Sequence, residues 1–251
     1  MLQIEHFSKT YPGGKKAVDD LTLAVNAGEI VGFIGHNGAG KTTTLRAVAG
    51  ILAYDQGTIT IDGHDVRTDG VNAKKVTAFL PDNPDLYEFM NGIDYLNFIA
   101  DIYGIPAQTR RQRIETYAGA FEIVGALGSP VSSYSHGMKQ KLALTSALIR
   151  QPRLLILDEP FVGLDPKASH LLKGFLAELC GAGGAVFFST HVLEVAEKLC
   201  HRVAILKGGK LICEGPTAEI VGSSTLEEVF LRQEGGRCVN SARFFGPRSG
   251  A

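Results

Sequence analysis

One segment of the sequence combines glycine, lysine and threonine at spacings suited to phosphate binding. It reads Gly35-His36-Asn37-Gly38-Ala39-Gly40-Lys41-Thr42-Thr43 and fits the pattern G-x-x-x-x-G-K-[ST] in full. Glycines let a loop curl so that backbone N–H groups point at phosphate oxygens, and a following helix adds its positive end. In this pattern Lys41 reaches the β- and γ-phosphates and the Thr42 hydroxyl ligates Mg²⁺. The segment therefore predicts a site for a nucleoside triphosphate, because a chance glycine-rich turn would not require the strand before it and the helix after it.

Two acidic residues follow an apolar run in the second half of the chain. Residues 154–157 read as a buried strand, and Asp158 and Glu159 come directly after it. Acids at the carboxyl end of a strand lie at the edge where open α/β sheets bind ligands. We expect Asp158 to contact Mg²⁺ through its water shell and Glu159 to polarise an attacking water. Taken alone, Asp-Glu-Pro after a strand would more simply be a solvated turn. Because the same chain also has a phosphate-binding segment, we favour the metal- and water-binding interpretation instead.

Strands and helices must position these groups, and hydrophobic periodicity predicts where they lie. Apolar and β-branched runs predict strands over 2–7, 17–25, 29–35, 58–62, 75–80, 154–157, 185–188 and 203–206. Helical spacing predicts helices over 42–52, 94–103 and 108–124, after Ser135, and from Pro166 behind a capping Asp165. A turn at 207–210 predicts a hairpin into 211–214. Such alternation predicts an α/β fold with a mostly parallel sheet and a helical block inserted in its middle.

Composition narrows the class of protein further. The chain has 251 residues, 45% of them hydrophobic, and a formal net charge of −1, which disfavours a protein whose main partner is a nucleic-acid backbone. Its four cysteines form no close pair, which argues against a zinc module and a disulfide scaffold. The sequence shows neither a signal peptide nor a run of about 18 apolar residues, so we expect a cytoplasmic protein that reaches a membrane only through a partner.

With these motifs in place, the sequence resembles the ATP-binding subunit of an ABC transporter over about residues 2–231. A third element, Tyr134-Ser135-His136-Gly137-Met138-Lys139-Gln140, occupies the place of the family's signature L-S-G-G-Q. Ser135 and Gly137 match it, whereas Tyr134, His136 and Met138 depart from it. Ser135 can cap the helix that follows and so present an anion-binding surface, although an ordinary N-cap has the same sequence. The resemblance implies that this surface closes on the γ-phosphate held by a second copy.

Three further residues match the layout of the family, and a fourth departs from it. Tyr11 corresponds to the aromatic residue that stacks on adenine, and His191 to a switch histidine that senses the γ-phosphate. Asp165, in Gly163-Leu164-Asp165, corresponds to a loop that crosses the dimer interface. Each of the three has a competing structural interpretation. Tyr11 could be a packing residue, His191 a polar group whose hydrogen bonds are satisfied, and Asp165 a plain helix cap. Asp82 stands where the family commonly has a Gln that touches Mg²⁺ and water, which puts its role in doubt.

The resemblance implies a P-loop NTPase (RecA-like) α/β core with an N-terminal antiparallel β subdomain. The ATP-binding domain is expected over 1–231, with a helical subdomain over about 82–150 and a low-order tail over 232–251. The implied cofactors are ATP and Mg²⁺: Tyr11 and residues 35–43 bind ATP, Thr42, Asp158 and Asp82 serve the metal, and Glu159 and His191 are catalytic.

The implied partners are a second nucleotide-binding domain, as a homodimer or heterodimer, and a membrane-spanning permease subunit. The permease would dock on the helical insertion and the loop at 82–87 and hold the chain on the inner face of the cell membrane. The ending at 225–231 resembles bacterial exporter-type subunits, which favours export. No nucleic-acid partner is expected.

The alternative function is that of a soluble ABC ATPase acting on DNA or ribosomes. Chromosome and DNA-repair relatives carry a long coiled coil between the phosphate-binding segment and the signature, and no sustained heptad repeat occurs here. Ribosome-associated relatives carry two cassettes, whereas this chain has a single phosphate-binding segment. A small GTPase is disfavoured because the sequence has no Asn-Lys-x-Asp motif.

Overall fold

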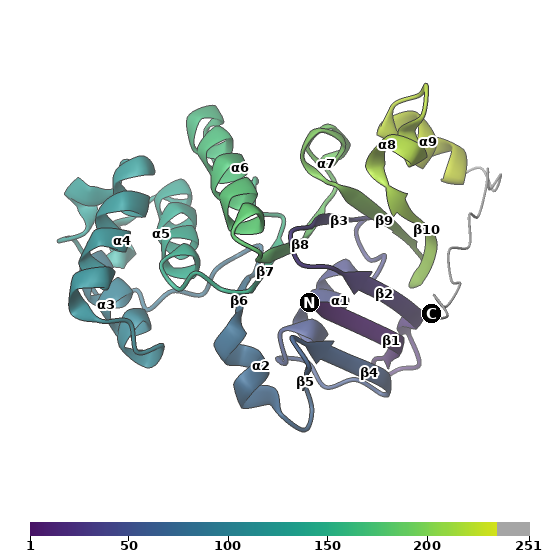
Figure 1. Ribbon diagram of the computed structural model, residues 1–251, viewed down its shortest axis with the longest axis horizontal. Helices are drawn as coiled ribbons and strands as arrows, with labels where there is room; N and C mark the ends of the chain where they lie inside the picture. The colour runs from purple at the N-terminus through teal and green to yellow at the C-terminus, as the bar shows by residue number, and fades with distance from the viewer. Residues whose placement is uncertain (235–251) are drawn as a thin grey trace, which may run out of the picture.

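Two β-sheets and three groups of helices build the fold (Figure 1). The computed structural model describes residues 1–234. Its four-stranded antiparallel sheet has the order β2-β1-β4-β5 and comprises β1 (Leu2–Thr10), β2 (Lys16–Val25), β4 (Gln56–Ile61) and β5 (His64–Asp65). Its six-stranded sheet has the order β10-β9-β3-β8-β7-β6 and comprises β3 (Ile30–Ile34), β6 (Thr77–Leu80), β7 (Leu154–Asp158), β8 (Ala185–Thr190), β9 (Arg202–Lys207) and β10 (Lys210–Pro216). Within this sheet β10 pairs antiparallel and the other strands pair in parallel, as the sequence predicts.

The helices lie on the faces and at the two ends of the six-stranded sheet. Next to the edge strand β6 are α3 (Gly92–Ile102), α4 (Ala107–Ala120) and α5 (His136–Leu148), and at the opposite end are α7 (Leu193–Leu199), α8 (Thr217–Val221) and α9 (Leu226–Glu234) (Figure 1). The remaining helices are α1 (Lys41–Val48), α2 (Gly70–Val76) and α6 (Pro166–Gly181), with short 3-10 turns at Val124–Ala126 and Val131–Ser133. None of the helices described between residues 1 and 234 has the length and apolar character needed to cross a membrane.

The central strands are buried on both faces, which explains their continuous apolar sequences. Every residue of β3, β7 and β8 is buried. One core cluster lies between this sheet and the antiparallel sheet, and a second joins its other face to α5, α6 and the helical region. At Gly32, in the middle of β3, an added Cβ would lie 2.6 Å from Cys200 Sγ, so that position has no room for a side chain.

The predicted elements differ from the observed ones mainly at their ends. The strand predicted over 75–80 begins at Thr77, because Lys75 and Val76 complete α2, a helix that the sequence did not predict. The helix predicted over 108–124 ends at Ala120, and Glu122 then turns the chain with a φ of 58°. The helix predicted over 42–52 already ends at Val48. Helix α9 continues past the expected start of the tail at 232, and residues 235–251 lie outside the described part of the chain.

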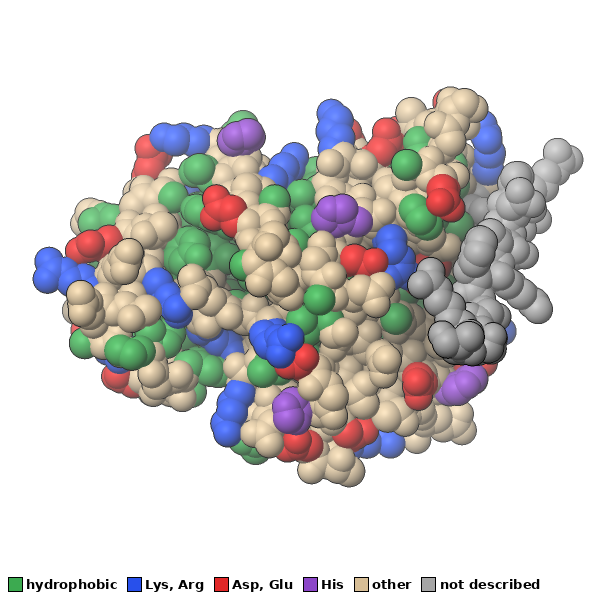
Figure 2. Space-filling view, viewed as in Figure 1, with side chains coloured by type: hydrophobic (Ala, Val, Ile, Leu, Met, Phe, Trp, Pro, Cys, Tyr) green, Lys and Arg blue, Asp and Glu red, His purple; other side chains and the backbone are tan. Residues whose placement is uncertain are grey.

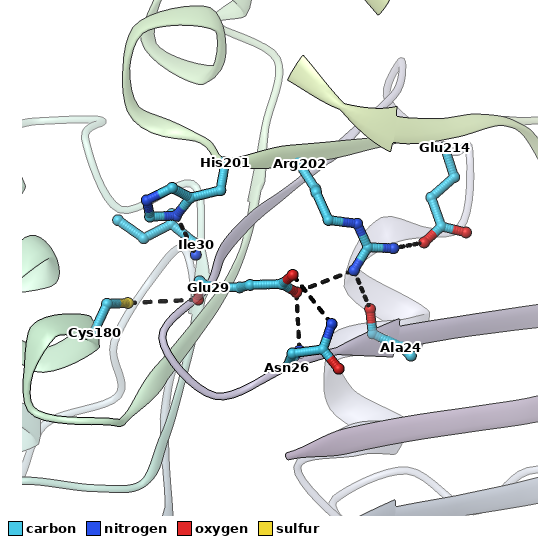
Figure 3. A network of polar contacts seen from close by, with 8 residues as sticks. All are labelled: Ala24, Asn26, Glu29, Ile30, Cys180, His201, Arg202 and Glu214. Carbon is cyan, nitrogen blue, oxygen red and sulfur yellow. Dashed lines mark hydrogen bonds and ion pairs between the residues drawn. The ribbon is translucent and has the colours of Figure 1, made fainter. Parts of the chain in front are cut away.

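A polar network holds the amino end of β3 in place (Figure 3). Arg202, the first residue of β9, donates to Glu29 Oε2 at 3.0 Å and also forms an ion pair with Glu214 of β10. The backbone and amide nitrogens of Asn26 donate to the two oxygens of Glu29 at 2.9 and 3.1 Å. The network therefore ties the turn before β3 to the two strands at one edge of the sheet.

The two carboxylates of this network have opposite pKa shifts. Burial opposes ionisation of Glu29, but the hydrogen bonds from Asn26 and Arg202 outweigh it and hold the pKa of Glu29 below its usual value. Burial raises the pKa of Glu214, and the nearby Glu29 charge adds to the rise, while Arg202 only partly offsets both effects. Arg202 therefore favours ionisation of both acids, and at Glu29 it adds to the larger effect of Asn26.

We expect Arg202→Gln to lower the free energy of unfolding by about 2–4 kcal/mol at pH 7, because two half-buried carboxylates lose their ion-pair partner. Without Arg202 the folded-state pKa of each acid is higher than in the unmodified protein, because Arg202 lowers both. The loss is then fully present above the folded-state pKa values of the variant, and it shrinks as the pH falls below them and both acids become protonated. Chemical denaturation of both proteins across this pH range measures the change.

Arg153→Gln is the matched control, since Arg153 pairs with Asp62 on the surface with 58% of its side chain exposed. That change should cost at most about 1 kcal/mol. Adding Glu214→Gln to Arg202→Gln should restore part of the loss. A defect that is independent of pH, or equal to that of the control, contradicts the role of the network.

Candidate active site

The glycine-rich segment forms a tight loop between β3 and α1. Added Cβ atoms would lie 2.5 Å from Leu206 O at Gly35 and 2.5 Å from Ala17 O at Gly40, where φ is also 110°. Glycine is therefore required at both positions, by close backbone approach and at Gly40 by backbone conformation as well. The Gly209 N–H, in the β9–β10 turn, donates to Ala39 O at 3.0 Å and fixes the loop from outside. The predicted strand–loop–helix arrangement is confirmed.

Lys41 is the buried cation of this loop. Its side chain is 6% exposed, and its ammonium donates to the Gly35 carbonyl at 2.5 Å and lies 3.8 Å from Glu159 Oε1. Burial lowers the pKa of the Lys41 ammonium, and the charges of Glu159 and Asp158 partly offset that shift. Both acids at the end of β7 therefore lie within electrostatic reach of the loop, as the sequence predicts.

Glu159 follows β7 directly and is hydrogen-bonded to residues at the end of β8. Asp158, the last residue of β7, is 2% exposed, and its Oδ1 accepts a hydrogen bond from the Ser189 hydroxyl. Glu159 turns away with a left-handed φ of 49°, and its carboxylate lies 3.0 Å from His191 Nδ1 and accepts from the His191 backbone N–H at 3.2 Å. Lys41, Asp158, Glu159 and His191 therefore meet at one edge of the parallel sheet.

Ser189 is a member of this site that the sequence analysis did not single out. Besides its bond to Asp158, its Oγ accepts from the Glu159 backbone N–H at 3.2 Å, so it orients both acids. The only sequence signal was its place two residues before His191 at the end of an apolar run. Parallel pairing of β7 with β8 sets Ser189 directly opposite Asp158, and that register is a tertiary feature.

The two other residues predicted for this region, Tyr11 and Asp82, both lie on its exposed side. The Tyr11 hydroxyl lies 3.3 Å from Thr43 Oγ1, so the ring stands beside the first turn of α1 with 36% of its surface exposed. Asp82 is exposed two residues after β6, the strand that pairs with β7. Thr42, His36, Asn37 and Gly38 also lie on the exposed side of the loop.

The signature segment begins helix α5. The Ser135 hydroxyl accepts from the Met138 backbone N–H at 3.3 Å, which is the predicted cap. The His136 ring lies against loop 163–165: an added Cβ at Gly163 would be 2.8 Å from His136 Cδ2, and Gly163 has a φ of 79°. Gly137 lies beside the same loop, with Gly163 O 3.0 Å from its added Cβ. Close packing therefore joins the signature segment to loop 163–165.

An ion pair strengthens the same junction. Lys141 of α5 lies 2.7 Å from Asp165, and this ammonium holds the pKa of Asp165 below its usual value. Asp165 also caps α6 by accepting from the Ala168 N–H at 2.8 Å, which confirms the predicted cap. Lys139 pairs with Glu88, so the first two turns of α5 contact both the 82–90 segment and loop 163–165.

The donor set suits a magnesium ion that is bound partly by phosphate. In the described residues no three His, Cys, Asp or Glu side chains converge on one point, so the chain has no all-protein metal cage there. Mg²⁺ commonly takes one or two protein oxygens and completes its shell with water and substrate phosphates. The Asp158 carboxylate and the Thr42 hydroxyl at the mouth of the loop fit that requirement.

We expect Gly163→Ala to destabilise the fold more than Gly183→Ala does. Both residues have a positive φ, 79° and 87°, but an added Cβ meets only open space at Gly183. Gly183→Ala therefore measures the backbone cost alone, about 1 kcal/mol. Chemical denaturation of both variants should give the excess cost of displacing the His136 ring.

Adding His136→Gly should remove that excess and leave the backbone cost. A double-mutant cycle between positions 136 and 163 measures this coupling, which we expect at about 0.5–1 kcal/mol. Equal effects of the two alanine substitutions, or a coupling of zero, would mean that the ring does not press on this loop.

Comparison with known sequences agrees with this geometry. The family model described as ABC transporter matches residues 18–162. An ABC transporter ATP-binding protein of Nostoc sp. is 36% identical over 210 residues, which cover 83% of this chain and 62% of that protein. The Nod factor export ATP-binding protein I of Paraburkholderia xenovorans is 35% identical over 222 residues, which cover 88% of this chain and 73% of that protein.

A solved structure, described as the ATP binding subunit of an ABC transporter, superimposes with a TM-score of 0.89 at 31% identity. The match covers 93% of this chain and 99% of that one. Sequence and fold therefore point to the same family. This agrees with the phosphate-binding loop, the acids at the end of β7 and the inserted helices described above. The chain belongs to the ABC transporter ATP-binding protein family and is an ATPase domain of that family.

Proposed function

We propose that this chain binds and hydrolyses ATP as one of two paired copies and thereby drives export through a separate membrane-spanning subunit. One observation carries the proposal: Lys41, Asp158, Glu159 and His191 meet at the carboxyl edge of the parallel sheet. A phosphate-binding cation, a metal-binding acid, a general base and an imidazole are the groups that hydrolysis of a γ-phosphate needs.

The exposed groups of the loop would bind the nucleotide. Tyr11 stands beside Thr43 with its ring accessible, which suits stacking on adenine. Residues 35–43 would surround the phosphates with backbone N–H groups, and the Lys41 ammonium would exchange the Gly35 carbonyl for phosphate oxygens. Thr42, Asp158 and Asp82 would hold Mg²⁺. A bound Mg²⁺ neutralises charge on the β- and γ-phosphates.

Glu159 would orient and deprotonate the attacking water. Its side chain is 12% exposed. The His191 backbone N–H donates to the Glu159 carboxylate, and the Glu159 backbone N–H donates to Ser189 Oγ, so both contacts fix its direction. A base held by such contacts loses little freedom when the water arrives. His191, 56% exposed at the end of β8, would sense the γ-phosphate while it keeps Glu159 in place.

A second copy would complete the site. The first turn of α5 offers the Ser135 hydroxyl, the backbone of Gly137 and Met138, and the positive end of a 13-residue helix. Its His136 ring and Lys141 contact loop 163–165, which carries Asp165. The proposed dimer would therefore place the signature surface and loop 163–165 together against the γ-phosphate of the other copy.

The surface around 83–98 would receive the membrane subunit. Tyr87, Phe89 and Phe98 form an aromatic surface in which the Tyr87 ring lies 5.9 Å from Phe89 and 5.6 Å from Phe98, and Phe89 is 84% exposed. Beside it lies an open cavity of about 490 Å³ lined by Asn83, Pro84, Asp85, Leu86, Glu88, His136 and Lys139. Exposed aromatic residues at the rim of a cavity are typical of a site that binds a partner helix.

Export is favoured over import and over the nucleic-acid alternative. The sequence of the export protein from Paraburkholderia aligns with 88% of this chain. On the face in Figure 2, Lys and Arg side chains alternate with Asp and Glu and form no broad basic area. A surface of mixed sign gives weak attraction to a phosphate backbone, which disfavours action on DNA or ribosomes.

We expect Glu159→Gln to convert a transient ATP-bound dimer into a lasting one. Glutamine keeps the size and the acceptor oxygen but cannot take a proton, so hydrolysis should fall by at least about a hundredfold while nucleotide binding survives. ATP then stabilises the dimer by mass action. Light scattering after size exclusion should show a monomer without nucleotide and a dimer with ATP.

The matched control is Glu115→Gln, because Glu115 is a carboxylate of α4 that is 65% exposed and pairs with Arg111 on the surface. It should hydrolyse ATP normally and form no lasting dimer. Adding Ser135→Arg to Glu159→Gln should return the protein to a monomer. A dimer that forms equally well without ATP, or that survives Ser135→Arg, rules out the composite site.

We expect Phe89→Asp to prevent membrane association without changing the fold or the ATPase of the isolated chain. The ring is almost fully exposed, so its loss costs little stability, but a carboxylate would be desolvated in the docked state. Sedimentation with membranes of the source organism measures the association. Val71→Asp is the control, since Val71 is 71% exposed on α2. Equal sedimentation of both variants contradicts docking at the aromatic surface.

A further inference from the structure

Helix α9 contacts the phosphate-binding loop, a contact that none of the roles above uses. The ring of Phe230, in α9, lies 4.7 Å from the ring of His36, centroid to centroid, at an interplanar angle of 53°. Phe230 is 9% exposed, whereas His36 is exposed on the loop. The contact joins residues 194 positions apart, so it forms only in the folded chain.

The sequence of α9 explains why one of its faces reaches the loop. Leu226 and Phe230, one helical turn apart, are buried, while Glu227, Glu228 and Leu231 point outward. The Thr225 hydroxyl accepts from the Glu228 N–H at 3.2 Å and caps the helix. The helix is thus formed by local signals and oriented by its two apolar residues.

A second contact fixes α9 to the element that follows His191. The Leu226 N–H donates to Glu197 Oε2 of α7 at 2.7 Å. Helix α7 starts two residues after His191 and also packs on β3, the strand that leads into the loop. With its first turn held on α7, α9 has a defined position from which Phe230 meets His36 (α7 and α9 lie together in Figure 1).

His36 is the residue of the loop at which such a contact has most effect. Its carbonyl accepts from the Ala39 N–H at 3.1 Å and lies 3.4 Å from the Lys41 ammonium. The next residues, Asn37 and Gly38, are exposed, and Gly38 has a φ of 81° with open space around it. A ring held at position 36 therefore restricts the most open part of the loop close to the anchor of Lys41.

We propose that Phe230 is a positioning residue for nucleotide binding: it holds His36, and with it residues 36–38 of the phosphate-binding loop, in the conformation that binds phosphate. A loop that is already ordered loses less entropy when the phosphates arrive. Without the contact, only a fraction of the molecules have the binding conformation, and the apparent Kd rises by the inverse of that fraction. The reacting atoms are untouched, so the rate of the bound complex stays the same.

The test uses the full chain and Phe230→Leu, which keeps an apolar side chain in the core cluster but removes the aromatic face. Titration calorimetry with Mg-ADP should show a Kd raised about three- to tenfold, the range set by the strength of an aromatic contact. The KM for ATP should rise by the same factor, while kcat stays within about twofold. Phe230→Tyr should restore the original Kd.

Two further variants separate positioning from general stability. Leu231→Ala changes the neighbouring side chain, which is 56% exposed, and should bind Mg-ADP as the unmodified chain does. His36→Ala removes the other ring while every residue of α9 stays the same, and should raise the Kd by a similar factor. In the His36→Ala background, Phe230→Leu should add no further loss of affinity.

The outcomes decide the proposal in either direction. An unchanged Kd in Phe230→Leu, even with a lower thermal midpoint, would mean that Phe230 only packs α9 and would overturn the proposal. Additive effects of His36→Ala and Phe230→Leu would overturn it too. A fall in kcat at constant KM would assign Phe230 to the chemical step and contradict positioning of the loop.

Discussion

A buried cation sets the main constraint on this molecule. The Lys41 ammonium lies almost out of contact with water, and such a charge is costly unless oxygen atoms surround it. Two carbonyls of its own loop, Gly35 and His36, and the Glu159 carboxylate provide those oxygens. Each partner is held in turn: the loop by the close approach of Gly35 and Gly40 to neighbouring backbone, and Glu159 by Ser189 and His191. The position of one charge thus requires the ends of β3, β7 and β8 to meet.

The same constraint makes the surroundings of Lys41 a compromise. Lys41 is bound by groups that a triphosphate would replace, and Glu159, held by the cation and by the imidazole, lies where its charge is partly neutralised. Phosphate oxygens are stronger partners for an ammonium than carbonyls are. Their arrival would release Glu159 from Lys41 while His191 retains it. In the proposed function, the contacts around Lys41 would in this way also prepare Glu159 for its water.

The sequence predicted the parts of the site that local rules determine. The glycine loop, the strand ending in Asp158, the caps at Ser135 and Asp165 and the mostly parallel sheet all follow from residue type, spacing and periodicity. Helix α2 was missed because a short segment with one buried residue, Ala73, has hardly any apolar periodicity. Contacts between distant segments had no local signal: Ser189 with Asp158, His136 with Gly163, and Phe230 with His36 depend on strand register and helix placement. The roles of Tyr11, Asp82 and His191 stay predictions, because residue positions alone do not show a bound nucleotide.

The close packing of Gly32 against Cys200 has a chemical consequence. Burial raises the pKa of the Cys200 thiol, and it raises the pKa of Cys180 to about 11, so neither side chain forms much thiolate in neutral solution. Since the thiolate is the form that attacks electrophiles and oxidants, both sulfurs are protected for as long as the sheet stays closed. Their reaction with an alkylating reagent would then proceed through transient openings of the structure. The alkylation rate of these two cysteines reports how often the centre of this ATPase opens.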